Sequence, residues 1–299
     1  MATIGLIAGA GGFPLLLATE ARRAGHRVVA TGFVNSTEPA LERAVDAFTW
    51  VKLGQFGKVI ESLKAGGATQ VVMLGGVTKK RFFIDVLPDA VGLQMMARAA
   101  IRTDDNLLRA GAAILEEHGL EVIDPTPFLT GALAPEGVLG REQPSQAERA
   151  DAAYGLELAQ AIGRLDLGQT VVVKLRCAVA VEALEGTDAC IRRGGELGGQ
   201  GTVVAKAVKP QQDRRLDLPA IGPRTIATMK AAGCRVLAVE AGGTLVMDRE
   251  ELVRQADKAG IVVLGLRSAP PGSGPGPAQE PGAAQAPAQE PGAARGPGR

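Results

Sequence analysis

The chain has 299 residues, of which 46% are hydrophobic and 22% charged. That length allows two ordinary domains, and the composition is typical of a globular protein. Thirty-three lysines and arginines face 32 aspartates and glutamates, which argues against a nucleic-acid backbone as the main partner. No apolar run approaches the roughly 20 residues of a membrane-spanning helix, and the N-terminus lacks the basic segment of a signal peptide. We therefore expect a cytoplasmic protein.

Cysteine and histidine offer little for a transition-metal site. The three cysteines show neither a C-x-x-C pair nor metal-ligand spacing, so we expect free thiols. The two histidines, His26 and His118, are both expected near helix ends. A zinc site is therefore disfavoured. A metal ion would instead be held by carboxylates, which suits Mg²⁺ or Mn²⁺.

Strand and helix patterns alternate over the first 130 residues. The expected strands cover residues 3–8, 27–33, 48–52, 69–75 and 120–123. The expected helices cover residues 14–24, 57–66 and 104–118. Alternation of this kind predicts a parallel sheet covered by helices.

A stretch rich in proline and glycine, residues 124–144, marks the expected domain boundary. Ser145 and Glu148 have the spacing of a capping box, which predicts a helix from there to about residue 164. A second α/β unit follows, with strands near 169–174, 177–182, 202–207, 235–240 and 261–265 and helices near 187–194, 222–232 and 249–259. Asp248 and Glu251 are expected to cap the last helix in the same way.

The last part of the chain has a different composition. From about residue 267 it is dominated by Pro, Gly, Ala, Gln and Glu, and PAQEPGAA occurs at 277–284 and again at 287–294. Such a segment cannot bury a core, so we expect a disordered low-complexity tail over residues 267–299.

A glycine-rich turn, Gly9-Ala-Gly11-Gly12-Phe13-Pro14, follows the first expected strand and opens a helix. Such a turn can bring backbone N–H groups to a phosphate or a ribose. It differs from the dinucleotide fingerprint because Pro14 takes the place of the third glycine and no acidic residue ends the second strand. NAD binding is therefore disfavoured. Two explanations of the glycines remain: the turn binds another nucleotide, or it is a tight turn that requires glycine for its backbone conformation alone.

A second glycine turn, Gly75-Gly76-Val77-Thr78, follows the fourth strand. In open parallel sheets, ligands bind at the carboxyl ends of the strands. A basic triplet, residues 79–81, follows this turn. The favoured interpretation is a solvated surface, and the alternative is a contact with phosphate or with an anionic membrane. The two turns together predict a ligand-binding edge in the first half.

Acidic residues gather in two segments of the second half. Glu182, Glu185 and Asp188 surround a glycine, while Asp213 and Asp217 lie between Pro210 and Pro219. Carboxylates can hold a divalent ion, and the neighbouring Lys and Arg can neutralise phosphoryl oxygens, as hydrolysis of a phosphoric anhydride requires. Any one of these acids alone would be read as a surface ion pair. No serine has a nucleophile motif or a histidine partner, so activated water is the expected nucleophile.

These segments together resemble a known family, the LpxI-type UDP-2,3-diacylglucosamine pyrophosphatases of lipid A biosynthesis. The resemblance covers residues 3–265 but not the tail, and it rests on GLIAGAGGFP, GGVT, DDNLLR, ADAAYGLELAQAIGRLDLGQTVVV, VEALEGTDACIRR, VAKAVKPQQDRRLDLPAIGPRT and VEAGGTLVMDREE. The EGTD and KPxQDxRxDxP segments are its most specific parts. The chain departs from many relatives at residues 174–178, where a Gln-Gly pair is expected.

The resemblance implies an α/β architecture with substrate held between two domains. It places a Rossmann-like N-terminal domain at residues 1–130, a linker at 131–145 and a catalytic C-terminal α/β domain at 146–266. It implies Mg²⁺-dependent hydrolysis in which water attacks the α-phosphorus. The products would be UMP and 2,3-diacylglucosamine 1-phosphate (lipid X).

The resemblance also implies the site residues. The essential aspartate would be Asp213, with Asp217 as second choice, and the metal ligands would be Asp213, Asp188 and Glu182, with Glu185 weaker. The expected substrate-binding residues are Gly9, Gly11, Gly12, Phe13, Pro14, Gly75, Gly76, Thr78, Thr187, Lys209, Gln212 and Arg214.

The expected partners are a UDP-linked lipid and, transiently, the cytoplasmic face of the inner membrane, with no nucleic acid. A homodimer is kept open. Two alternatives to the hydrolase remain, an NAD(P)-binding oxidoreductase and a non-catalytic nucleotide-binding protein.

Overall fold

The computed structural model of the chain describes residues 1–76, 87–99, 104–211 and 213–267. Residues 77–86, 100–103, 212 and 268–299 lie outside the described part, and so does nearly all of the predicted tail. Over the described ranges, no helix combines the length and the apolar character that crossing a membrane requires.

The first half contains a five-stranded sheet, as predicted. Its strands are β1 (Thr3–Ala8), β2 (Arg27–Phe33), β3 (Ala47–Val51), β4 (Gln70–Leu74) and β5 (Glu121–Val122). Their order is β3-β2-β1-β4-β5, and every neighbouring pair is parallel. This is the strand order of doubly wound nucleotide-binding sheets. Because all strands run the same way, both predicted glycine turns leave the sheet at the same edge.

Helices cover both faces of this sheet. They are α1 (Phe13–Arg23), α2 (Phe56–Ala65) and α5 (Asp104–Glu117). A further helix, α4 (Ala90–Arg98), and short 3₁₀ segments at Pro39–Arg43, Thr126–Phe128 and Thr130–Ala132 complete this half. Leu6 packs with α1, whereas the next residue, Ile7, packs with α2 and α5 on the opposite face. This alternation follows from the two-residue period of a strand.

Helix α4 is absent from the sequence-based prediction. It packs against α2 and α5 instead of covering the sheet, so it lacks a long buried stripe. Asp89 begins it by accepting a hydrogen bond from the Gly92 amide, and the same carboxylate accepts one from the Gly57 amide at the start of α2. A short helix held in this way gives a weak periodic signal.

The second half contains a six-stranded sheet in the order β6-β13-β11-β9-β7-β8. The strands are β6 (Gly137–Leu139), β7 (Thr170–Lys174), β8 (Cys177–Val181), β9 (Thr202–Lys206), β11 (Cys234–Glu240) and β13 (Val262–Leu266). The strands β9, β11 and β13 are parallel, whereas β6, β7 and β8 pair with their neighbours in antiparallel fashion. A small parallel pair, β10 (Ala220–Ile221) and β12 (Leu245–Val246), stands apart from it.

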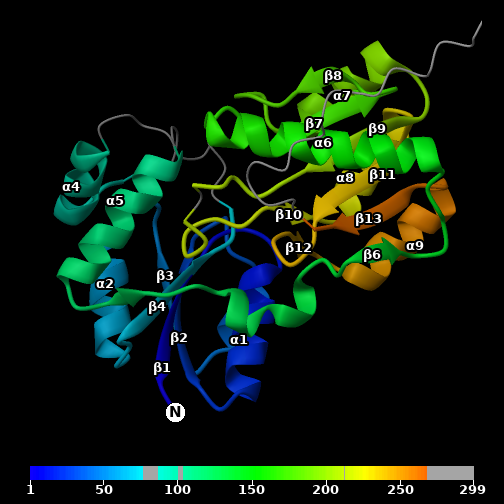
Figure 1. The fold of residues 1–299 in the computed structure, drawn as a ribbon. Helices are drawn as coiled ribbons and strands as arrows, with labels where there is room; N and C mark the ends of the chain where they lie inside the picture. Colours follow the sequence, from blue (N-terminus) through cyan, green and yellow to red (C-terminus); the bar gives the residue numbers. More distant parts are fainter. Residues whose placement is uncertain (77–86, 100–103, 212, 268–299) are drawn as a thin grey trace, which may run out of the picture. The chain divides into compact units, whose positions relative to one another are not determined.

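Four helices pack on this sheet (Figure 1). On one face lies α6 (Gln146–Arg164), and on the other lie α7 (Thr187–Gly198), α8 (Pro223–Ala231) and α9 (Arg249–Ala259). The predicted capping box of Ser145 and Glu148 is confirmed. The predicted box at Asp248 is wrong, because Asp248 has a left-handed φ of 44° and its side chain makes no capping hydrogen bond.

Strand alternation brings three polar residues to one place. Val172, Ala180 and Val204 all belong to the core beneath α7, α8 and α9. Each of these residues has a polar residue two positions away on the same face: Thr170 before Val172, Glu182 after Ala180 and Lys206 after Val204. Because β7 is antiparallel to β8 and β9, all three polar residues lie toward the same end of the strands. Thr170 and Lys206 are cross-strand partners, and Glu182 directly follows β8. The three polar residues therefore share one face at one edge of the second sheet.

The two halves touch one another through several segments of the compact unit Met1–Ser268. Leu218 and Leu245 of the second half join the core cluster that contains Phe13 of α1. Leu216 joins the cluster on the opposite face of the first sheet. The segment between β9 and β10 therefore contacts both faces of the first half.

Candidate active site

The two predicted glycine turns of the first half are joined by hydrogen bonds. The Gly9 amide donates to the Leu74 carbonyl at 2.8 Å, and Ala10 and Gly76 exchange two backbone hydrogen bonds of 2.8 and 3.0 Å. A Cβ on Gly9 would lie 2.5 Å from the Gly75 carbonyl oxygen, so the close approach requires glycine. Gly75 itself has a φ of +98°.

Different parts of the first glycine turn have different surroundings. The Phe13 and Pro14 side chains are buried, which leaves only their backbone for a ligand. Gly12 is approached by Met247 of the second half, whose Sδ lies 3.1 Å from the position a Cβ would take. At Gly11, by contrast, an added Cβ would meet no atom of the described residues within 4 Å. Gly11 is thus the member of this turn with open space around it.

A polar cluster lies at the edge of the second sheet where α7 begins. Thr187 donates from Oγ1 to Glu182 Oε1 at 3.0 Å, and its Oγ1 lies 3.3 Å from that of Thr170. The other carboxylate oxygen, Glu182 Oε2, accepts a hydrogen bond from the backbone amide of Gln169 at 3.3 Å. Asp188 in the first turn of α7 forms an ion pair of 2.6 Å with Arg224 in the first turn of α8. The predicted residues Glu182, Thr187 and Asp188 are therefore brought together.

Lys206 lies within this cluster and is buried. Burial lowers the pKa of Lys206, and the nearby carboxylates of Glu182, Asp217 and Asp188 raise it, with burial the larger effect. We use the name Lys206 cluster for Lys206, Glu182, Asp188 and Asp217. It groups two predicted metal ligands and the second-choice aspartate by their electrostatic effect on the Lys206 ammonium group.

The segment after β9 is held at several points. The Lys209 ammonium forms an ion pair of 2.8 Å with Asp166, which precedes β7. The Val208 amide donates to Glu240 Oε2 at 3.0 Å, so the end of β11 fixes the start of the segment. Arg214 donates to the Gly242 carbonyl at 3.3 Å. The two predicted cationic residues, Lys209 and Arg214, are thus both engaged within the second half.

Asp213 is paired with Arg215. Arg215 donates to its carboxylate from Nη2 at 2.7 Å and from Nε at 3.0 Å. Arg215 Nη1 also forms an ion pair of 2.9 Å with Glu116 of α5. This ion pair connects the second half of the chain to the first. The hydrogen bonds from Arg215 hold the pKa of the Asp213 carboxyl below its usual range. Asp213 is therefore ionised at neutral pH and tied through Arg215 to the first half.

This pairing predicts a pH-dependent loss of stability when Arg215 is replaced by glutamine. A carboxyl whose pKa is lower in the folded state stabilises the fold above its unfolded pKa and loses that effect as pH falls through the folded value. Because Arg215 is 41% exposed, we expect a loss of only about 1 kcal/mol near pH 7. Urea unfolding at pH 7 and pH 3 measures the unfolding free energies of the variant and the unmodified protein. The difference between these free energies should be smaller at pH 3 than at pH 7. An equal difference at both pH values would contradict the assignment.

The predicted site residues fall into separate groups. The Lys206 cluster lies at the edge of the second sheet, Asp213 pairs with Arg215, and Glu185 pairs with Arg193 on α7. Within the described ranges, no three His, Cys, Asp or Glu side chains form a metal-binding group, so Asp213, Asp188 and Glu182 are not assembled as one. Thr78 and Gln212 lie outside the described residues.

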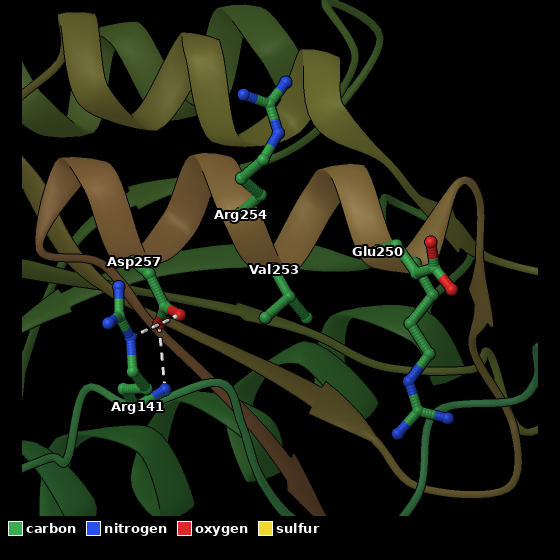
Figure 2. Close-up of a pocket in the computed structure, with 6 residues that line it drawn as sticks. Arg141, Glu250, Val253, Arg254 and Asp257 are labelled. Carbon is green, nitrogen blue, oxygen red and sulfur yellow. Dashed lines mark hydrogen bonds and ion pairs between the residues drawn. The ribbon is translucent and has the colours of Figure 1, made fainter.

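An open depression of about 600 Å³ lies elsewhere, along α9. It is lined by Arg141, Arg249, Glu250, Val253, Arg254 and Asp257. Figure 2 shows Arg141 turned toward the Asp257 carboxylate, with an Nε–Oδ2 distance of 3.2 Å, whereas Arg254 points away. None of these residues is a predicted site residue, and the chemistry described above lies outside this depression.

Two residues of the site region are missing from the sequence-based prediction, Lys206 and Arg215. Lys206 ends the strand TVVAK, and a lysine on an otherwise apolar buried strand is the signal that marks it. Arg215 is the arginine of the KPxQDxRxDxP segment, but its pairing has no sequence signal, because its partner Glu116 is 99 positions away in the chain. Only the fold brings those two together.

Comparison with known proteins identifies relatives over nearly the whole described chain. The LpxI N-terminal domain matches residues 3–132, and the LpxI C-terminal domain matches residues 135–264. A protein of Caulobacter vibrioides named UDP-2,3-diacylglucosamine pyrophosphatase LpxI is 38% identical over 277 residues, which cover 89% of this chain and 98% of that protein.

Solved structures give only distant likenesses. CobK precorrin-6A reductase is 13% identical with a TM-score of 0.30, covering 90% of this chain and 89% of its own. N5-carboxyaminoimidazole synthetase from Staphylococcus aureus is 12% identical with a TM-score of 0.25, and the match covers 58% of this chain but only 38% of that one. Scores this low bear on neither fold nor function. The matches to both LpxI domains and to the Caulobacter protein, by contrast, establish the family. This chain therefore belongs to the LpxI family.

Proposed function

We propose that this chain hydrolyses the pyrophosphate bond of UDP-2,3-diacylglucosamine. The observation that carries the proposal is the match to a pyrophosphatase of that name, at 38% identity over 98% of its length. The two family domains match residues 3–132 and 135–264, which contain both glycine turns, the Lys206 cluster and the segment with Asp213. The proposal therefore concerns the whole arrangement and not one motif.

The chemistry of the site region suits a phosphoric anhydride. Gly11 offers a backbone approach with open space at the end of a parallel strand, where nucleotides bind in such sheets. Lys209 and Arg214 supply positive charge for phosphoryl oxygens in the second half. In this proposal the first half holds the UDP end and the second half carries out the hydrolysis.

We further propose Mg²⁺, or Mn²⁺, as the cofactor. Mg²⁺ in phosphate-transfer sites is held by one or two carboxylates and completed by substrate phosphates and water, so a three-carboxylate cage is not required. In this proposal Asp213 would supply one carboxylate ligand, whereas Glu182 and Asp188 belong to the separate Lys206 cluster and form no three-carboxylate group with it among the described residues. A bound divalent ion would lower the pKa of a water molecule and offset charge on the phosphates.

The finer course of the reaction follows from the same proposal. Asp213, with its geometry set by Arg215, would orient the water for attack on the α-phosphorus. The products would then be UMP and 2,3-diacylglucosamine 1-phosphate. Contact with the cytoplasmic face of the inner membrane is proposed on the ground that the substrate is a lipid.

One assay tests this function directly. Purified protein with UDP-2,3-diacylglucosamine and Mg²⁺ is expected to release UMP, and EDTA is expected to stop the release until Mg²⁺ is restored in excess. In ¹⁸O-labelled water, the label should appear in UMP if attack is at the α-phosphorus and in the lipid phosphate if it is at the β-phosphorus. If no UMP is released, the proposed hydrolase function is wrong, and the non-catalytic nucleotide-binding alternative is favoured.

A further inference from the structure

Lys206 has an unusual environment for a lysine. It ends β9 with only 7% of its surface exposed, and its Nζ donates to the Ala220 carbonyl at 3.0 Å. Burial of an ammonium group is costly unless opposite charges or hydrogen bonds compensate for it. The surroundings of Lys206 must therefore supply that compensation.

Three carboxylates supply part of that compensation, with burial still the larger influence on the pKa of Lys206. Glu182, Asp217 and Asp188 each interact electrostatically with the Lys206 ammonium, and strand alternation places Glu182 on the same sheet face and edge. Arg224 adds a second cation through its ion pair with Asp188.

Lys206 also reaches the segment that carries both candidate aspartates. Its hydrogen bond to Ala220 fixes the end of the segment between β9 and β10. The start of the same segment is fixed by the bond from Val208 to Glu240, and Asp213 and Asp217 lie between these two points. The Asp217 amide donates to the Asp213 carbonyl at 3.2 Å, so the two aspartates share one turn.

Given the proposed hydrolase function, we propose that Lys206 is a positioning residue for the reaction. Its tether to Ala220 fixes the turn that carries the candidate aspartates, and its charge holds the Asp217 carboxylate at the edge of the second sheet. It acts through these groups and needs no contact with the substrate.

A comparison with Lys174 separates this role from a merely structural one. Lys174 lies in β7 of the same sheet, and its Nζ also donates to backbone carbonyls, those of Gly198 and Gln200. Because β7 is antiparallel to β9, Lys174 lies at the opposite edge of the sheet. Replacement of Lys174 by methionine is thus a matched control that removes a lysine tether remote from the Lys206 cluster.

The test measures steady-state kinetics with UDP-2,3-diacylglucosamine. Lys206→Met is expected to lower kcat about 100-fold, the scale reported for loss of one preorganised electrostatic group, with a much smaller change in KM. Lys206→Gln replaces the ammonium group with an uncharged amide on a side chain one atom shorter, and it should show a similar loss of kcat. It also serves as the second variant if Lys206→Met does not fold. Lys174→Met should lower the melting temperature and leave kcat unchanged.

A second readout does not depend on turnover. Thermal unfolding of Lys206→Met, Asp217→Asn and the double variant gives the coupling between the two side chains, and the double variant should lose less than the sum of the single losses. Additive losses, or a kcat for Lys206→Met equal to that of Lys174→Met, would overturn the inference. Failure of the unmodified protein to release UMP would instead overturn the proposed function, while the coupling would still decide whether Lys206 positions Asp217.

Discussion

Replacement of Asp213 by asparagine is expected to lower kcat by about 1,000-fold, while UDP affinity falls only slightly. Asparagine keeps the size of the side chain and removes the charge that a divalent ion or an attacking water would need. The fold should tolerate the change, because Arg215 keeps its second partner, Glu116, at 2.9 Å. UMP release measures kcat, and isothermal titration with UDP measures binding separately.

The control for this variant is Glu116→Gln. Glu116 contacts the same arginine from the opposite side, so its replacement disturbs Arg215 without changing the Asp213 carboxylate. We expect a small loss of stability and a nearly unchanged kcat. Equal losses of kcat in both variants would mean that Arg215, and not Asp213, is the group that matters.

Asp217→Asn in the same assay separates the two candidate aspartates. Asp217 belongs to the Lys206 cluster, whereas Asp213 is paired with Arg215. If Asp213 orients the water, Asp217→Asn should retain more activity than Asp213→Asn. The reverse order would transfer the essential role to Asp217.

The sequence predicts the fold well where hydrophobic periodicity is strong. The strands of the first sheet end within about two residues of their predicted limits, because alternation of strand and helix leaves few other solutions. Short elements escape the prediction. β10 and β12 have two residues each and are defined by mutual pairing, and β6 lies within the proline-rich stretch read as a linker.

The sequence indicates candidate site residues one at a time, but it does not specify how they are arranged. The spacing of Glu182, Thr187 and Asp188 around a glycine correctly places them at one turn. Their association with Lys206 depends on the antiparallel pairing of β7 with β9, which periodicity does not specify. The Arg215–Glu116 pair likewise depends on how the two halves meet. The chemistry of each residue is local information, whereas the pairing of charges is a property of the fold.

A single methyl group at Gly9 is expected to destabilise the protein by about 2–3 kcal/mol. In Gly9→Ala the new Cβ would lie 2.5 Å from the Gly75 carbonyl oxygen and 2.8 Å from that of Gly76. Both obstacles are backbone atoms, which cannot turn aside as a side chain can. The two glycine turns must therefore separate, and the paired hydrogen bonds between Ala10 and Gly76 should be lost or lengthened.

Gly76→Ala is the matched variant for this prediction. It adds the same methyl group to the facing turn, but at a position where no atom in the described part of the chain lies within 4 Å. We expect a change in unfolding free energy of less than about 0.5 kcal/mol, measured by urea denaturation beside Gly9→Ala. UDP titration of Gly76→Ala then gives independent information, because a loss of affinity without a loss of stability would mean that the ligand approaches this turn. Similar unfolding free energies for the two variants would show that contact between the turns does not hold this edge of the sheet together.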